Sequence, residues 1–119
     1  MVFLALAASY AIGIGAGSVW YGAHGGDHAI YPDCRGEFVE RLAEALRICD
    51  WNPITLVAPY LYWDKVGILK KGLELKVDYS LTRTCYEGGE LACGECGSCT
   101  ERLEAFKTLG VRDPISYIQ

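Results

Sequence analysis

Hydrophobic and polar positions along the chain predict four helices. The first of them, residues 1–12, is apolar on every side, which is typical of a helix that is covered on more than one face. The other three each carry an apolar stripe at helical spacing. The stripes are Phe38, Leu42, Leu46 and Cys49 in residues 36–48, Val66, Leu69 and Leu73 in residues 65–76, and Leu103, Phe106 and Leu109 in residues 99–109.

Two short runs rich in β-forming residues lie between these helices, at residues 18–23 and 55–61. Pro59 belongs at the end of the second strand or on a sheet edge, because proline cannot donate a ladder hydrogen bond. Alternation of helices and strands predicts an α/β layer with a parallel sheet. Two strands make a poor sheet, so together with the apolar leading helix they indicate part of a larger fold.

Polar residues beside the helices predict where the helices begin and end. Asp33 is placed to cap the helix at residues 36–48. Ser98 and Glu101 are spaced as a capping box, which puts Cys99 in a first helical turn, where the helix dipole favours its thiolate. Gly110 is placed to end that last helix.

Composition and charge exclude some classes of function. The 119 residues carry a formal net charge of −4 and contain no lysine- or arginine-rich run, which argues against direct binding of nucleic acid. With 51% hydrophobic residues the chain can build a core as one domain or as a piece of a larger one.

The first 23 residues contain no charged side chain, a length that could span a bilayer. The stretch is interrupted by four glycines and has neither a basic leader nor flanking lysine or arginine. A helix followed by a buried strand is therefore favoured over a membrane anchor, and we expect a cytoplasmic protein.

Four of the six cysteines, Cys85, Cys93, Cys96 and Cys99, fall within fifteen residues, the last three at C-x₂-C-x₂-C spacing. Thiolates so close together can converge on one tetrahedral ion, and the intervening glycines allow the tight turns that this requires. Structural zinc is the favoured interpretation. An iron–sulfur cluster is the main alternative and disulfides are the third, since nothing else indicates a secreted chain.

The loop at residues 24–35, between the first strand and the second helix, has a dense chemistry. Ligands of open α/β sheets bind beyond the carboxyl ends of strands, which is where this loop lies. His24, Asp27 and His28 are spaced like metal ligands, but ordinary hydrogen bonds of two loop histidines are the favoured interpretation.

Two more residues of this loop have alternative roles. Arg35 could pair with Asp33 or Glu37, or it could clamp a carboxylate substrate through two parallel hydrogen bonds. Cys34 is either a small buried thiol, the commoner fate, or a pocket residue, and a nucleophilic role would need a base beside it.

Three motifs together carry a resemblance that covers essentially the whole chain. They are Tyr-Pro-Asp-Cys-Arg at residues 31–35, Cys-Tyr-Glu-Gly-Gly-Glu at residues 85–90, and the cysteines at 93, 96 and 99. With them the chain resembles the 7-cyano-7-deazaguanine synthase (QueC) family. The resemblance implies the C-terminal part of a Rossmann-like adenine nucleotide alpha hydrolase fold, with residues 1–83 as a partial α/β layer and residues 84–119 as a four-cysteine zinc-binding module.

The resemblance also implies a reaction, the ATP-dependent conversion of 7-carboxy-7-deazaguanine and ammonia to a nitrile for queuosine or archaeosine in tRNA. The carboxylate is first adenylated and aminated, and a second ATP then activates the amide for dehydration. The family pattern makes Cys85, Cys93, Cys96 and Cys99 the zinc ligands. It makes four residues candidates for the substrate side of the pocket: Asp27, Tyr31, Asp33 and Arg35.

The chain departs from the family pattern at the phosphate site. The family begins with a strand and a Ser-Gly-Gly-x-Asp-Ser loop that holds the ATP pyrophosphate, and these residues contain no such loop. ATP and magnesium would therefore bind only through a missing N-terminal half, supplied by a partner chain or a longer gene product, and this chain alone is expected to be inactive. The alternative is a non-catalytic zinc-stapled module that assembles with a second copy or another protein. Arg83 stands where the family more often has tryptophan.

Overall fold

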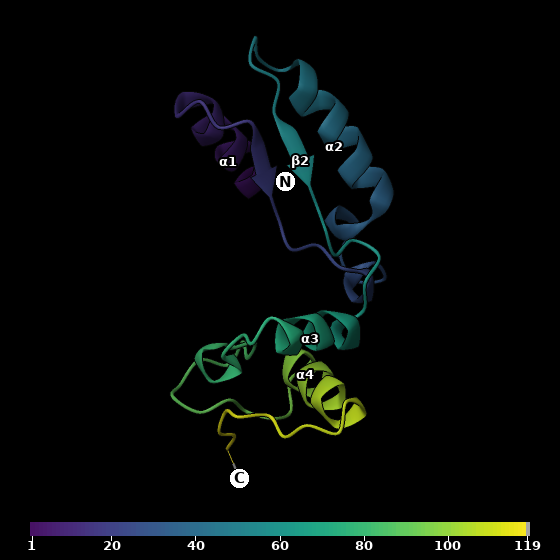
Figure 1. The fold of residues 1–119 in the computed structure, drawn as a ribbon, viewed down its shortest axis with the longest axis vertical. Helices are drawn as coiled ribbons and strands as arrows, with labels where there is room; N and C mark the ends of the chain where they lie inside the picture. Colours follow the sequence, from purple (N-terminus) through teal and green to yellow (C-terminus); the bar gives the residue numbers. More distant parts are fainter. Residues whose placement is uncertain (119) are drawn as a thin grey trace. The chain divides into compact units, whose positions relative to one another are not determined.

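A computed structural model describes residues 1–118 of the chain. By its internal contacts the chain divides into two compact units, Met1–Asp64 and Lys65–Gln119 (Figure 1). The sequence predicts a different kind of boundary, between residues 83 and 84, which separates the proposed pocket layer from the proposed metal module. That functional division stays a prediction.

The first unit is an α/β layer with a parallel pair of strands. Its elements follow the order α1 (Val2–Gly13), β1 (Ser18–Trp20), α2 (Gly36–Ile48) and β2 (Thr55–Val57), with 3₁₀ turns at Gly25–Asp27 and Pro32–Cys34 between β1 and α2. The strands pair in parallel with Val19 opposite Leu56, which confirms the predicted class. Each strand is shorter than predicted. Beyond the ladder, the N–H of Gly25 donates to the Trp63 carbonyl at 2.7 Å.

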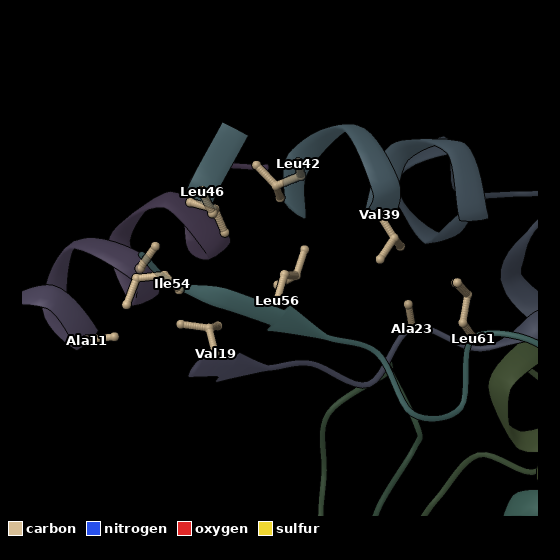
Figure 2. Packing of buried hydrophobic residues seen from close by; sticks show 10 residues of the cluster. Ala11, Val19, Ala23, Val39, Leu42, Leu46, Ile54, Leu56 and Leu61 are labelled. Carbon is tan, nitrogen blue, oxygen red and sulfur yellow. The ribbon is translucent and has the colours of Figure 1, made fainter. Parts of the chain in front are cut away.

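The core of this unit lies between α2 and the strands. Val39, Leu42 and Leu46 of α2 are buried, and in Figure 2 they extend toward the strand residues. Ile54 at the entry to β2 is only 1% exposed. The prediction that Cys49 completes the stripe is wrong, because α2 ends at Ile48 and the exposed Cys49 thiol turns back to donate to the Leu46 carbonyl.

Helix α1 buries only its small residues within the described chain. Ala8 and Ala11 pack in the core, whereas Phe3, Leu6 and Tyr10 are 86%, 62% and 71% exposed. The expectation that this helix is covered on more than one face is therefore not met by residues 1–118. Across the same residues, no helix combines the length and apolar character needed to cross a bilayer.

The second unit contains α3 (Lys65–Glu74), a 3₁₀ turn at Tyr79–Leu81 and α4 (Gly97–Thr108). Its core is small. Leu69 of α3 packs with Ala105 and Phe106 of α4, and partly buried side chains surround them: Val66, Leu73, Tyr79 and Leu109. Helix α4 stops before Gly110 at φ 66°, as predicted, while the predicted core residue Leu103 is only half-buried.

Arg102 of α4 is the centre of a buried polar network in this unit. Its Nε and Nη2 donate to the two carboxylate oxygens of Asp113 at 2.6 and 2.9 Å, and its Nη1 donates to the Thr82 hydroxyl at 2.8 Å. Tyr117 adds a hydrogen bond to Asp113 at 2.7 Å. Burial alone would raise the pKa of Asp113, but the bonds from Arg102 and Tyr117 outweigh it and hold that pKa below its usual range. The network fixes the C-terminal tail on α4.

Replacing Arg102 with methionine should destabilise the second unit strongly. The substitution leaves the Asp113 carboxylate buried without its partner, a loss of about 3–5 kcal/mol in the free energy of unfolding. Chemical denaturation measures this loss, and Arg112→Met, at an exposed position of the same unit, is the matched control. The double variant with Asp113→Asn should regain part of the stability. A loss below about 1 kcal/mol for Arg102→Met would contradict the stabilising role of this buried ion pair.

Candidate metal centre

The four clustered cysteines converge on one point. The Sγ atoms of Cys85, Cys93, Cys96 and Cys99 all lie within 4.8 Å of one another, and those of Cys93 and Cys99 are 3.9 Å apart. A regular tetrahedron with metal–sulfur bonds of 2.3 Å has sulfur–sulfur edges of about 3.8 Å. All six cysteines of the chain are free thiols. The four residues can therefore hold a metal ion.

A tight turn and the start of α4 position three of these sulfurs. Gly94, at φ 78°, turns the chain so that the N–H groups of Glu95 and Cys96 donate to the Cys93 sulfur at 3.4 and 3.3 Å. Cys96 is the residue before the helix, and Cys99 lies in its first turn, as predicted. The predicted capping box is wrong, since α4 already begins at Gly97 and its N-cap is Cys96, which makes no side-chain cap.

The electrostatic environment of the four thiols is uneven. Hydrogen bonds from backbone N–H groups, chiefly that of Cys93 and then that of Glu87, lower the pKa of Cys85 to about 6. The pKa of Cys96 is also lowered, mainly by a hydrogen bond from the N–H of Tyr86. Burial has the opposite effect on Cys99 and raises its pKa to about 12. A cation between the sulfurs would favour the thiolate form of all four.

Contacts with a nearby arginine and with the C-terminal tail hold the loop that connects Cys85 to Cys93. The guanidinium of Arg83 donates to backbone carbonyls at residues 88, 90 and 91. Beyond them, Ala92 forms a parallel bridge to Tyr117 in the tail. At the two ends of the loop, the Cys93 N–H donates a hydrogen bond to the Cys85 sulfur at 3.3 Å. The role of Arg83 could not be predicted from the sequence, because its acceptors are backbone carbonyls, which leave no pattern in the side chains.

The loop at residues 24–35 belongs to the other unit, and there it is anchored by aromatic residues. The ring of His28 meets the ring of Tyr62 edge-on at 6.2 Å, and the Tyr21 hydroxyl donates to the Asp33 carbonyl at 3.1 Å. The prediction that Asp33 caps α2 is wrong. The N-cap is Arg35, and no side chain caps that end of the helix. Tyr31, Asp33 and Arg35 are exposed.

Within this loop the two histidines are not grouped as ligands of one ion, but the prediction that both make ordinary hydrogen bonds is only partly met: among residues 1–118, His24 Nδ1 and His28 Nε2 are buried without a hydrogen-bond partner. His24 is buried, and its Nε2 lies 3.1 Å from a carboxylate oxygen of Asp27. In the part of the chain that the structure describes, the cysteine cluster is the group whose ligand atoms converge, and these histidines are not among them. Burial is the main cause that raises the pKa of Cys34, and the charges of Asp27 and Asp33 add to it. Cys34 is therefore a neutral thiol and a poor nucleophile at pH 7.

Comparison with known proteins agrees with this arrangement. The family model described as "Queuosine biosynthesis protein QueC" matches residues 1–110, which include the loop at 24–35, the four cysteines and helix α4. The chain belongs to the QueC family. The α/β layer with a parallel sheet is consistent with the nucleotide alpha hydrolase fold of that family.

Individual QueC relatives are similar along nearly the whole chain. The 7-cyano-7-deazaguanine synthases of Methanoregula boonei and Caldicellulosiruptor saccharolyticus are each 60% identical over 117 residues, and that of Marinobacter nauticus is 57% identical. Each alignment covers 98% of this chain but only 54%, 52% and 53% of the respective relative. The chain therefore spans about half the length of the curated relatives that it matches.

Loss of the metal should disorder the segment that carries the four cysteines, residues 84–110. Metal binding to four thiolates in small modules contributes on the order of 10–16 kcal/mol at neutral pH, which exceeds what the small core of this unit can supply. Cys96→Ser or a strong chelator should therefore raise amide hydrogen exchange across residues 84–110, and acid should do the same because protons compete for the thiolates. Cys49→Ser, at the exposed end of α2, is the control. Unchanged exchange and melting after metal removal would contradict this expectation.

Proposed function

We propose that this chain forms the C-terminal part of a 7-cyano-7-deazaguanine synthase, which converts 7-carboxy-7-deazaguanine, ammonia and ATP to the nitrile in the cytoplasm. The observation that carries the proposal is the QueC match over residues 1–110, together with relatives of that name at 57–60% identity. The activity belongs to the whole synthase, so the chain's own contribution is to bind and orient.

Zinc is the ion proposed for the four cysteines. Their sulfurs are spaced as the ligands of a single tetrahedral ion, and four thiolates are a usual ligand set of structural zinc. Each thiolate of a [4Fe–4S] cluster binds a different iron atom, so its sulfurs cannot approach one another as closely as 3.9 Å. A closed four-cysteine site leaves no open position on the ion, so its role is structural and it activates no water.

The loop at residues 24–35 is proposed as the substrate side of the pocket. The Arg35 Nε donates to the His28 carbonyl at 2.7 Å, and among residues 1–118 no ion pair joins Arg35 to Asp33 or Glu37. Its two terminal nitrogens can then donate two parallel hydrogen bonds to the carboxylate of the substrate.

The purine-like edge of the substrate presents N–H donors, for which carboxylates are the matching acceptors. Asp27 and Asp33 are the carboxylates that this loop offers, and Tyr31 offers an exposed ring for stacking. These three residues would orient the ring, while Arg35 would fix the carboxylate where ATP must reach it. Holding the two reactants in this geometry is what proximity contributes to catalysis.

The phosphate-binding loop is proposed to come from a partner chain or from a further part of the same protein. Adenylation turns the carboxylate into an acyl-adenylate with release of pyrophosphate, and ammonia then displaces AMP to give the amide. A second ATP adenylates the amide oxygen, again with release of pyrophosphate, and loss of AMP with two protons leaves the nitrile. Both activations need backbone N–H groups that neutralise phosphate charge, which a Ser-Gly-Gly-x-Asp-Ser loop supplies.

An ATP-turnover assay with the carboxylate substrate and ammonia tests the proposal. The 119-residue chain alone should release no AMP, and addition of the N-terminal half of the Methanoregula boonei relative should restore it. In the restored enzyme, Arg35→Lys should raise the KM for the carboxylate about 10-fold or more with a smaller effect on kcat, because a forked, charge-assisted contact is lost. Arg47→Lys, on the exposed face of α2, is the control.

Two outcomes would contradict the proposal. Robust AMP release by the chain alone would show that the phosphate loop is not required. An unchanged KM in Arg35→Lys would remove Arg35 from the substrate site.

A second candidate function is a non-catalytic assembly module derived from the family. The exposed Phe3, Leu6 and Tyr10 of α1 favour it, since large apolar side chains side by side on a helix mark interaction surfaces. A stable oligomer that shows no affinity for the deazapurine, and no activity with the added N-terminal half, would favour this candidate over the synthase.

A further inference from the structure

Arg83 holds the loop between the first two cysteines by its side chain alone. Its Nη2 donates to the carbonyls of Gly88 at 2.7 Å and Leu91 at 3.2 Å, and its Nη1 donates to the carbonyl of Glu90 at 3.0 Å. One guanidinium thus binds three carbonyls within four consecutive residues. Lysine could not reproduce this geometry, because its ammonium is a single point of charge and the guanidinium is a rigid planar fork.

The residues on either side of Arg83 are fixed to helix α4. The Thr82 hydroxyl accepts a hydrogen bond from Arg102 at 2.8 Å, and the Thr84 hydroxyl donates to the Ser98 carbonyl at 3.3 Å. Ser98 lies between Cys96 and Cys99 in the sequence. The backbone from which the Arg83 side chain extends is therefore tied to the same helix start that presents two of the four sulfurs.

The loop that Arg83 binds has little structure of its own. Gly88 and Gly89 both have positive φ values, 71° and 74°, and residues 86–91 are exposed. Glycines in such a loop lose much conformational freedom when the loop is ordered, so the ordering needs compensating contacts. Arg83 supplies three, and Ala92 supplies two more at the end of the loop, through backbone bonds with Ser116 and Ile118.

We propose that Arg83 is a positioning residue for the metal centre, which fixes the 85–93 loop so that the sulfur of Cys85 meets the other three. The proposal rests on metal binding by the four cysteines. Cys85 stands eight residues before Cys93, while the other three are spaced by three residues and share a turn and a helix start. The Thr84 bond to Ser98 holds the chain just before Cys85, and the loop that Arg83 binds holds it just after, so Arg83 supplies the second of the two restraints on this ligand.

Zinc affinity of the full chain, measured by competition with a chromophoric chelator, tests this role. Arg83→Met and Arg83→Lys should each weaken zinc binding about 10-fold, the lower end of what loss of an outer contact to a metal site costs. Arg112→Met removes an exposed arginine from the same unit and should leave the affinity unchanged.

A second readout separates positioning from general stability. With zinc bound, timed alkylation followed by mass spectrometry should show faster modification of Cys85 in both Arg83 variants, with little change at Cys93, Cys96 and Cys99. Cobalt substitution reports the same event, since loss of one thiolate changes the absorption of a four-sulfur cobalt site. Far-UV circular dichroism of the zinc-loaded variants verifies that α3 and α4 persist.

Each contrary outcome overturns a distinct claim. Wild-type affinity in Arg83→Lys with weak binding in Arg83→Met would show that the charge matters and the fork does not, which overturns the positioning role. Unchanged affinity in both variants, or equal acceleration of alkylation at all four cysteines, would overturn it as well. A wild-type chain that binds no metal would instead refute the metal assignment on which the proposal rests.

Discussion

The convergence of four cysteine sulfurs is the constraint on which the second unit depends. Its apolar core consists of three buried residues, Leu69, Ala105 and Phe106, with a rim of partly buried ones. A core of that size contributes little against the entropy of ordering some fifty residues, and small domains of this kind usually need a metal or another cross-link. Four thiolates on one ion would tie the 85–99 loop to α4 and supply that stabilisation.

Helix α4 connects the sulfur cluster with the rest of its unit. Cys96 and Cys99 lie at its first turn, and Arg102 follows on the same side one turn later with its bonds to Asp113 and Thr82. The guanidinium carbon of Arg102 also lies 5.3 Å from the centre of the Phe106 ring. One helix thus presents metal ligands, a buried ion pair and the apolar core in succession, so a disturbance at any of the three should reach the other two.

Features that show in the pattern of side-chain types could be predicted from the sequence, and features that depend on backbone or tertiary partners could not. The helices follow from hydrophobic periodicity, the parallel pair from the alternation of helices and strands, and the cysteine cluster from residues three to eight apart. The burial of Arg102 depends on Asp113, eleven residues later, and on Thr82, twenty residues earlier. Arg83 binds carbonyls, which every residue has. Asp33 and Ser98 looked like caps, but the N-caps are Arg35 and Cys96, and neither helix start has a side-chain cap.

X-ray absorption at the zinc edge of the purified chain tests the central claim most directly, since it reads both the metal and its ligands. We expect one zinc per chain with four sulfur neighbours at about 2.3 Å and no nitrogen or oxygen neighbour. A folded chain without zinc, or a zinc ion with fewer than four sulfur ligands, would contradict it.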